Sequence, residues 1–189
     1  MSRVPTVGGD RNKVGTAYSL IVFTAIVPGH EPAVKAAIEG LPRGTDGPWA
    51  RFERVHAARL QIYDQPVYQG APQKPERLRS SYLSTAIVDG DRDPFLDEIC
   101  ERMPAEAESW WGHCVGYPGV ADRAAFRRWI VHNQIETALV TSPYPTASVQ
   151  DVRESLALRE RVVEFAIAAQ GLDAAELQQR FRQAFSDVR

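Results

Sequence analysis

The stretch AYSLIVFTAIVPGHEPAVKAAIEGLP (Ala17–Pro42) sets the plan on which the rest of the chain is interpreted. Its first half, Ala17–Gly29, is a long apolar and β-branched run that ends in Pro-Gly. Such a run predicts a buried strand followed by a turn. In the second half, Pro32 suits the first turn of a helix, and Gly40 with Pro42 ends that helix. The stretch therefore predicts a strand, a turn and an amphipathic helix.

The same succession recurs further along the chain. ARFERVHAARLQIYD (Ala50–Asp64) predicts a second strand, and a segment rich in Pro, Gln and charge predicts a surface loop after it. Ser80–Gly90 predicts a third strand, Asp91–Pro104 a helix, and ESWWGHCVGYPG (Glu108–Gly119) a fourth strand. The order strand–helix–strand–strand–helix–strand predicts an α+β, ferredoxin-like (βαββαβ) antiparallel sheet with helices on one face.

The remainder of the chain is mostly helical. A helix is predicted over Ala121–Gln134, then a short strand or extended segment over Ile135–Pro145. Ser148 and Asp173 can cap two further helices, and Gly171 ends the first of them. We therefore expect a C-terminal helical hairpin.

These patterns predict three parts of the chain. Residues 1–16 read as a flexible N-terminal arm. Residues 17–120 form the ferredoxin-like domain, and residues 121–189 form a mainly helical extension that packs on the same domain.

Composition restricts the classes of function. The chain has 189 residues, 44% of them hydrophobic, and a net charge of −2, which gives no electrostatic argument for binding nucleic acid or an acidic membrane. No apolar run approaches the roughly 20 residues that span a bilayer. The sequence contains no metal-binding or nucleotide-binding motif. The two cysteines, Cys100 and Cys114, make no disulfide framework, and we expect a reduced cytoplasmic protein.

Several segments together resemble a family of bacterial proteins of uncharacterised function. The segments are PWARFERVHAARLQIYD, SYLSTAIVDGDRDPFLDEI, SWWGHCVGYPG, AFRRWIVHNQI and SPYPTASVQDVRESLALRERVVEFA, and they cover most of residues 48–167. The family pattern includes a Trp…Gly-Tyr-Pro-Gly strand end and a Tyr-Pro-x-Ala segment. The family is similar to the dimeric α+β-barrel group, which contains haem peroxidases, haem-degrading and cofactor-free monooxygenases, isomerases and cyclases. The resemblance implies a ferredoxin-like fold and a homodimer, but it assigns no catalytic residue.

The predicted fourth strand concentrates the candidate chemistry. Alternation places Trp111, His113 and Tyr117 on one face of that strand and Trp110 with Cys114 on the other. The first face has two interpretations. It is either the wall of a pocket, with His113 as a catalytic residue and Trp111 and Tyr117 as substrate-binding residues, or a dimer interface. Cys114 reads as a small buried residue rather than a nucleophile.

His56 and Arg59 are the other candidates. Their odd separation places them on opposite faces of a strand unless a bulge intervenes. His56 is a candidate catalytic residue and Arg59 a candidate substrate-binding residue, or both are structural. His30 is expected in solvent. His132 is expected at a helix end or on the surface, with haem ligation as the alternative.

The sequence leaves two classes of function open. The first is the binding or transformation of a small apolar or aromatic molecule, including oxidative chemistry that is haem-dependent or cofactor-free. The second is a non-catalytic dimerisation or partner-binding module that uses the aromatic sheet face. Whether the protein is an enzyme stays open. The cofactor is unknown, since haem would fit the resemblance but has no motif here. We expect a small-molecule ligand and a homo-oligomer.

Overall fold

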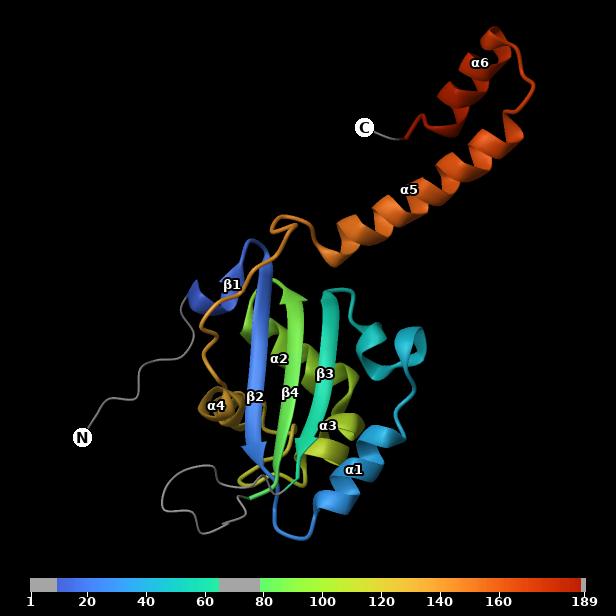
Figure 1. Cartoon of the computed structure of the whole chain (residues 1–189). Coiled ribbons are helices and arrows are strands. Elements are labelled where there is room, and N and C mark those ends of the chain that lie inside the picture. The colour runs from blue at the N-terminus through green and yellow to red at the C-terminus, as the bar shows by residue number, and fades with distance from the viewer. Residues whose placement is uncertain (1–9, 65–78, 188–189) are drawn as a thin grey trace, which may run out of the picture. The chain divides into compact units, whose positions relative to one another are not determined.

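The computed structural model describes residues 10–64 and 79–187 (Figure 1). The chain divides into two compact units, residues 1–149 and residues 150–189. The boundary between the two units therefore falls after Val149. The helix predicted from Ala121 belongs to the unit that contains the sheet.

The first unit is built on a four-stranded antiparallel sheet. The predicted strands at Ala17–Gly29, Ala50–Asp64 and Ser80–Gly90 are confirmed. The strands are β1 (Lys13–Val14), β2 (Ala17–Ala25), β3 (Val55–Tyr63) and β4 (Ser81–Asp89), and they lie in the order β1-β2-β4-β3. β1 and a 3-10 helix, η1 (Asp10–Asn12), occupy part of the segment that was expected to be a flexible arm.

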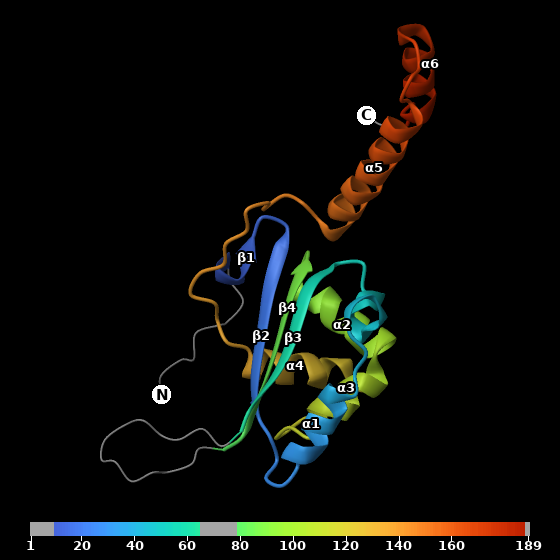
Figure 2. The ribbon, with the colours of Figure 1, turned by 45° about the vertical axis from the view of Figure 1, so that its right-hand side comes forward.

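Helices gather on one side of this sheet (Figures 1 and 2). They are α1 (Glu31–Glu39), α2 (Arg92–Arg102), α3 (Pro104–Trp111) and α4 (Arg123–Asn133). Two 3-10 helices, η2 (Gly44–Asp46) and η3 (Pro48–Arg51), precede β3. The fold class is therefore α+β.

Alternation along the strands directs one set of side chains into the core. Tyr18, Leu20 and Val22 of β2 are buried with Tyr82 and Val88 of β4, since every second residue of a strand shares a face. The helices add a dense aromatic layer to this core. It consists of Trp49, Phe52, Phe95, Trp110, Trp111, Phe126 and Trp129.

The predicted fourth strand at Glu108–Gly119 is wrong. Ser109–Trp111 form the last turn of α3, and the amide of Gly112 closes that turn on the Glu108 carbonyl at 3.1 Å. Pro104 in the first turn and the following Ala and Glu residues favour a helix, and this local preference prevails. What remains of the expected strand is one bridge between Ile26 and Cys114. The βαββαβ order is therefore not confirmed.

Short segments from three places in the chain close the outer edge of β2. β1 pairs with its first residues. The amide of Ile135 donates to the Ile21 carbonyl at 2.9 Å. The amide of Val115 donates to the Ala25 carbonyl, also at 2.9 Å. Unpaired strand edges attract other chains, so these segments protect an edge that would otherwise be open.

The second unit is a hairpin of two helices, as the sequence predicts. α5 (Val149–Ala168) leads through Gly171, whose φ is 83°, to α6 (Ala174–Ala184). The Asp173 side chain accepts hydrogen bonds from the amides of Ala175 and Glu176 at 2.9 Å and so caps α6. Among the helices of the described residues, none is long and apolar enough to cross a membrane.

Candidate functional site

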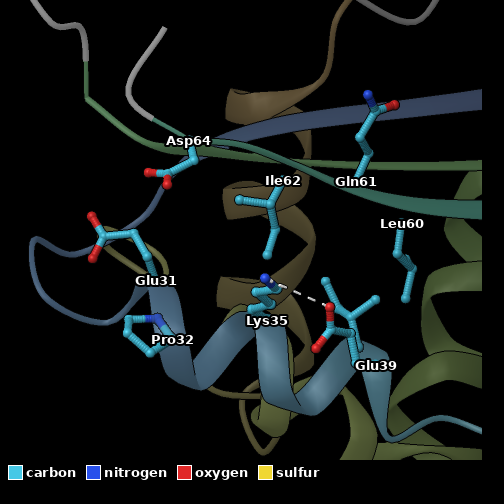
Figure 3. A pocket seen from close by; sticks show the side chains of 9 residues that line it. Glu31, Pro32, Lys35, Glu39, Leu60, Gln61, Ile62 and Asp64 are labelled. Atoms are coloured by element: carbon cyan, nitrogen blue, oxygen red, sulfur yellow. Dashed lines mark ion pairs between the residues drawn. The ribbon is translucent and has the colours of Figure 1, made fainter.

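A groove lies between α1 and β3, with a volume of about 560 Å³ (Figure 3). β3 is the last strand of the sheet, so the groove follows the sheet's outer edge. A volume of this size falls within the range of small-molecule sites, about 300–1,000 Å³. The groove is lined by Glu31, Pro32, Lys35, Ile38, Glu39, Leu60, Gln61, Ile62 and Asp64.

Alternation along β3 makes the floor of the groove apolar. Leu60 and Ile62 point toward α1, whereas Gln61 between them points away from it (Figure 3). Ile38 comes from α1, on the face that the helix turns to the sheet, and all three apolar side chains are partly buried against the core. The floor can therefore hold the apolar part of a ligand.

The rim of the groove carries more negative than positive charge. Glu31 and Asp64 lie at one end (Figure 3). Glu31 Oε2 accepts a hydrogen bond from the Gly29 amide at 2.9 Å, and Asp64 Oδ1 accepts one from the Ser80 hydroxyl at 2.9 Å. Each carboxylate is thus oriented by a hydrogen bond to one of its two oxygens. Carboxylates are acceptors only, so this end suits a ligand group that donates hydrogen bonds or carries positive charge.

The ammonium group on the rim, that of Lys35, already forms an ion pair. Lys35 Nζ lies 3.8 Å from Glu39 Oε1, one helical turn away (Figure 3). Among the described residues that line the groove, no other cation stands beside Glu31 and Asp64 at the opposite end. The part of the lining that the structure describes also contains no histidine, cysteine or tyrosine, the usual axial ligands of haem iron.

Trp111 and Tyr117 do not form the exposed face that was predicted. Trp111 is buried at the end of α3, where its ring centroid lies 5.5 Å from that of Phe126. Tyr117 is half-buried, and its hydroxyl donates to Glu108 Oε1 at 3.2 Å. Burial, together with the Glu108 carboxylate, raises the pKa of Tyr117 far above its usual range. Trp111 therefore packs in the core, and Tyr117 packs at its edge.

His113 lies away from both aromatic residues, beside His30. The two Nδ1 atoms are 3.1 Å apart and the rings meet edge to face. Val27 positions both residues, because its amide donates to the His113 carbonyl and its carbonyl accepts from the His30 amide, each at 2.9 Å. His30 is exposed, as predicted. This contact is a local histidine pair outside the groove.

A bulge brings His56 and Arg59 to the same side of the sheet. The pairing register of β3 shifts between Val55 and Ala57, at His56. His56 Nε2 then lies 2.7 Å from Oδ1 of Asp89, on the sheet face opposite the helices. Arg59 is paired with Thr85, which points to that same face. Neither residue lines the groove.

The side chains of Asp89 and Cys114 both make hydrogen bonds that hold the fold together. Oδ2 of Asp89 accepts a hydrogen bond from the Val149 amide at 2.7 Å, so the carboxylate joins β4 to the end of the unit. Cys114 is buried, with its sulfur 3.1 Å from the Thr24 hydroxyl. Burial raises the pKa of the Cys114 thiol to about 11, which is unsuitable for a thiolate nucleophile.

The sheet face opposite the helices presents apolar side chains. Phe23 and Tyr63 are exposed there, with ring centroids 5.9 Å apart and an edge-to-face orientation. Ile87 is exposed on the same face. No helix of the first unit covers this face in the part of the chain that the structure describes (Figure 2).

Sequence reasoning missed the residues of the groove. The even face of β3 and the amphipathic α1 were both visible in the sequence, but nothing in it indicated that Glu31 and Asp64 meet at one end. Within residues 10–64 and 79–187, no group of three or more His, Cys, Asp or Glu side chains could hold a metal ion. Comparison with models of protein families, with curated proteins and with solved structures finds no match.

Proposed function

We propose that this protein binds a small apolar or aromatic molecule in the groove between α1 and β3. The observation that carries the proposal is the combination of an apolar floor with an acidic end in one cavity of about 560 Å³. Ligand sites are mostly apolar with a few placed polar groups, and this groove has that composition.

The charge of the rim narrows the class of ligand. Glu31 and Asp64 stand at one end, where the part of the groove that the structure describes contributes no cation, while Lys35 is paired with Glu39. An amine or another hydrogen-bond donor would satisfy these carboxylates, and a ligand carboxylate would be repelled. The ligand is therefore a molecule with an apolar or aromatic body and a cationic or donor end.

A matched pair of probes tests this assignment. Calorimetric titration with 2-phenylethylamine and with 3-phenylpropionate compares the same ring with opposite end charges. We expect the amine to bind more tightly than the acid. Equal affinity of the two probes, or binding of the acid alone, would overturn the acidic end as the recognition element.

Two substitutions place the amine in the groove. Glu31→Gln and Asp64→Asn keep size and one acceptor oxygen but remove one charge each, and each should weaken amine binding about fivefold, since an exposed ion pair contributes up to about 1 kcal/mol. Glu53→Gln removes an exposed carboxylate that does not line the groove and should leave affinity unchanged. Loss of affinity in all three variants alike would contradict the proposal.

A second candidate is a non-catalytic dimerisation or partner-binding module. It is favoured by the exposed Phe23, Tyr63 and Ile87 on the sheet face opposite the helices, a different surface from the one around Trp111 that the sequence suggested. Exposed apolar side chains gathered on one face mark interaction sites. Light scattering of Ile87→Glu against the unmodified chain tests it: a mass that Ile87→Glu does not change would exclude this face as the interface.

A further inference from the structure

The helical hairpin of the second unit buries almost none of its side chains. Beyond Val149 at its start, α5 contains no buried residue, and α6 contains none. Isolated helices are marginal in water, and in proteins most of their stability comes from packing an apolar face. The hairpin therefore has apolar surface that α5 and α6 do not cover for each other.

One face of α5 is already used by α6. The Phe165 ring lies 5.7 Å from the Phe181 ring and 5.4 Å from the Phe185 ring, centroid to centroid. Arg161 donates to the Ala184 carbonyl at 2.5 Å and pairs with Asp187 at 2.8 Å. Arg161 and Phe165 thus mark the side of α5 that faces α6.

The opposite face of α5 carries a stripe of exposed aliphatic residues. At about 100° per residue, its members fall within an arc of about 60°, roughly opposite Phe165. We call this surface the α5 stripe. It consists of Val152, Leu156, Val163 and Ile167, all of them exposed.

The spacing of the α5 stripe is symmetric along the helix. Its intervals are four, seven and four residues, so the stripe reads the same from either end about a point between Arg159 and Glu160. A two-fold axis at that point would set Val152 against Ile167 of a second copy, and Leu156 against Val163. Isologous interfaces have this property, because each patch must complement itself.

Charges on one flank of the α5 stripe come close to the same symmetry. Arg153 and Glu164 lie on the same side of the stripe, at opposite ends of the helix. In an antiparallel pair, each Arg153 comes within two residues, about 3 Å along the helix, of the level of Glu164 of the other copy, and this happens twice. Glu160 lies between them and comes close to Glu160 of the other copy near the two-fold axis. The repulsion between these like charges limits the strength of the dimer.

We infer that the α5 stripe is a self-association surface through which two copies of this chain pair in antiparallel fashion. The α5 stripe is separate from the groove and from the exposed residues of the sheet. A second copy is the partner because the spacing of the apolar side chains is self-complementary and because Arg153 comes near the level of the opposite charge, Glu164.

Neighbouring valines supply a matched test. Val162 and Val163 are exposed to the same degree, 47% and 49%, but point about 100° apart, and only Val163 belongs to the α5 stripe. In sedimentation velocity on the full chain, we expect a dimer that Val163→Glu weakens at least 100-fold and Val162→Glu leaves intact. A monomer at all concentrations up to about 0.5 mM, or equal effects of both substitutions, would overturn the inference.

A charge exchange tests the antiparallel direction. Arg153→Glu should weaken the dimer about tenfold, because it places like charges near Glu164 twice, and Arg153→Glu combined with Glu164→Arg should restore it. Failure of the double variant to restore the dimer would contradict the two-fold arrangement. A dimer that Ile87→Glu abolishes and Val163→Glu does not would assign pairing to the sheet face and overturn the inference.

Discussion

Gly15 lies directly against the carbonyl group of Pro145. The amide of the next residue, Thr16, donates a hydrogen bond to the Pro145 oxygen at 2.9 Å, and a Cβ atom added at Gly15 would stand 1.5 Å from that oxygen. Gly15 also has a φ of +59°, a conformation that glycine adopts readily. The turn between β1 and β2 and the segment that leads to α5 are therefore joined at a point where no side chain fits.

Gly15→Ala should destabilise the protein more than Gly29→Ala. Gly29 has a φ of +89°, and nothing lies within 4 Å of the position that an alanine methyl group would take, so alanine there costs backbone strain alone, about 1–3 kcal/mol. At Gly15 the methyl group must also displace the Pro145 carbonyl and its hydrogen bond, which adds about 1 kcal/mol or more. Urea denaturation of both variants measures the difference, and equal free energies of unfolding would contradict the close approach.

Cys114 should resist thiol reagents in the folded state. Its pKa of about 11 leaves on the order of 10²-fold less thiolate at pH 8 than an ordinary cysteine has. The measurement is the rate of labelling by an aromatic disulfide in a Cys100→Ser background, with and without urea. Rapid labelling of the folded chain would show that the thiol is accessible and ionised.

Stability should fall in alkaline solution because of Tyr117 and Tyr82. Burial raises the pKa of both hydroxyls in the folded chain, so the unfolded chain loses these protons first. The stabilisation is fully present below the unfolded pKa, near 10, and is lost as pH rises through the folded value. We expect the melting temperature to fall above about pH 10, less steeply in Tyr117→Phe.

Trp111→Ala should lower the free energy of unfolding. The side chain is buried among aromatic rings, and removing a buried Trp costs about 3–5 kcal/mol. Phe23→Ala, at an exposed position on the sheet face opposite the helices, should cost about 1 kcal/mol or less. Chemical denaturation compares the two variants. A small loss at Trp111 would indicate a role outside the core.

The strands and most of the helices could be predicted because their signals are local. The run before Pro28 and the stripe on α1 identify β2 and α1 without knowledge of the rest of the chain. The segment Glu108–Gly119 misled because its aromatic and small residues alternate in a way that suits a strand. The signal in favour of α3 lay upstream, at Pro104 and the residues after it.

The candidate site could be predicted only in part because it depends on distant contacts. The sequence marked His56, but it did not mark the bulge or the Asp89 carboxylate that lies 2.7 Å from the histidine ring. Glu31 and Asp64 come from different elements, and only the packing of α1 beside β3 brings them to one groove. Alternation indicates the face of a strand but not its neighbours.

The closure of the β2 edge has a consequence for the synthesis of this protein. The segments that pair with Ala25 and Ile21 are translated long after β2, at His113–Val115 and at Gln134–Ile135. Until residue 135 has left the ribosome, most of that edge has no partner from its own chain. A nascent chain halted before Gln134 would thus offer an open strand to other chains, and the finished polypeptide removes this hazard with its own later residues.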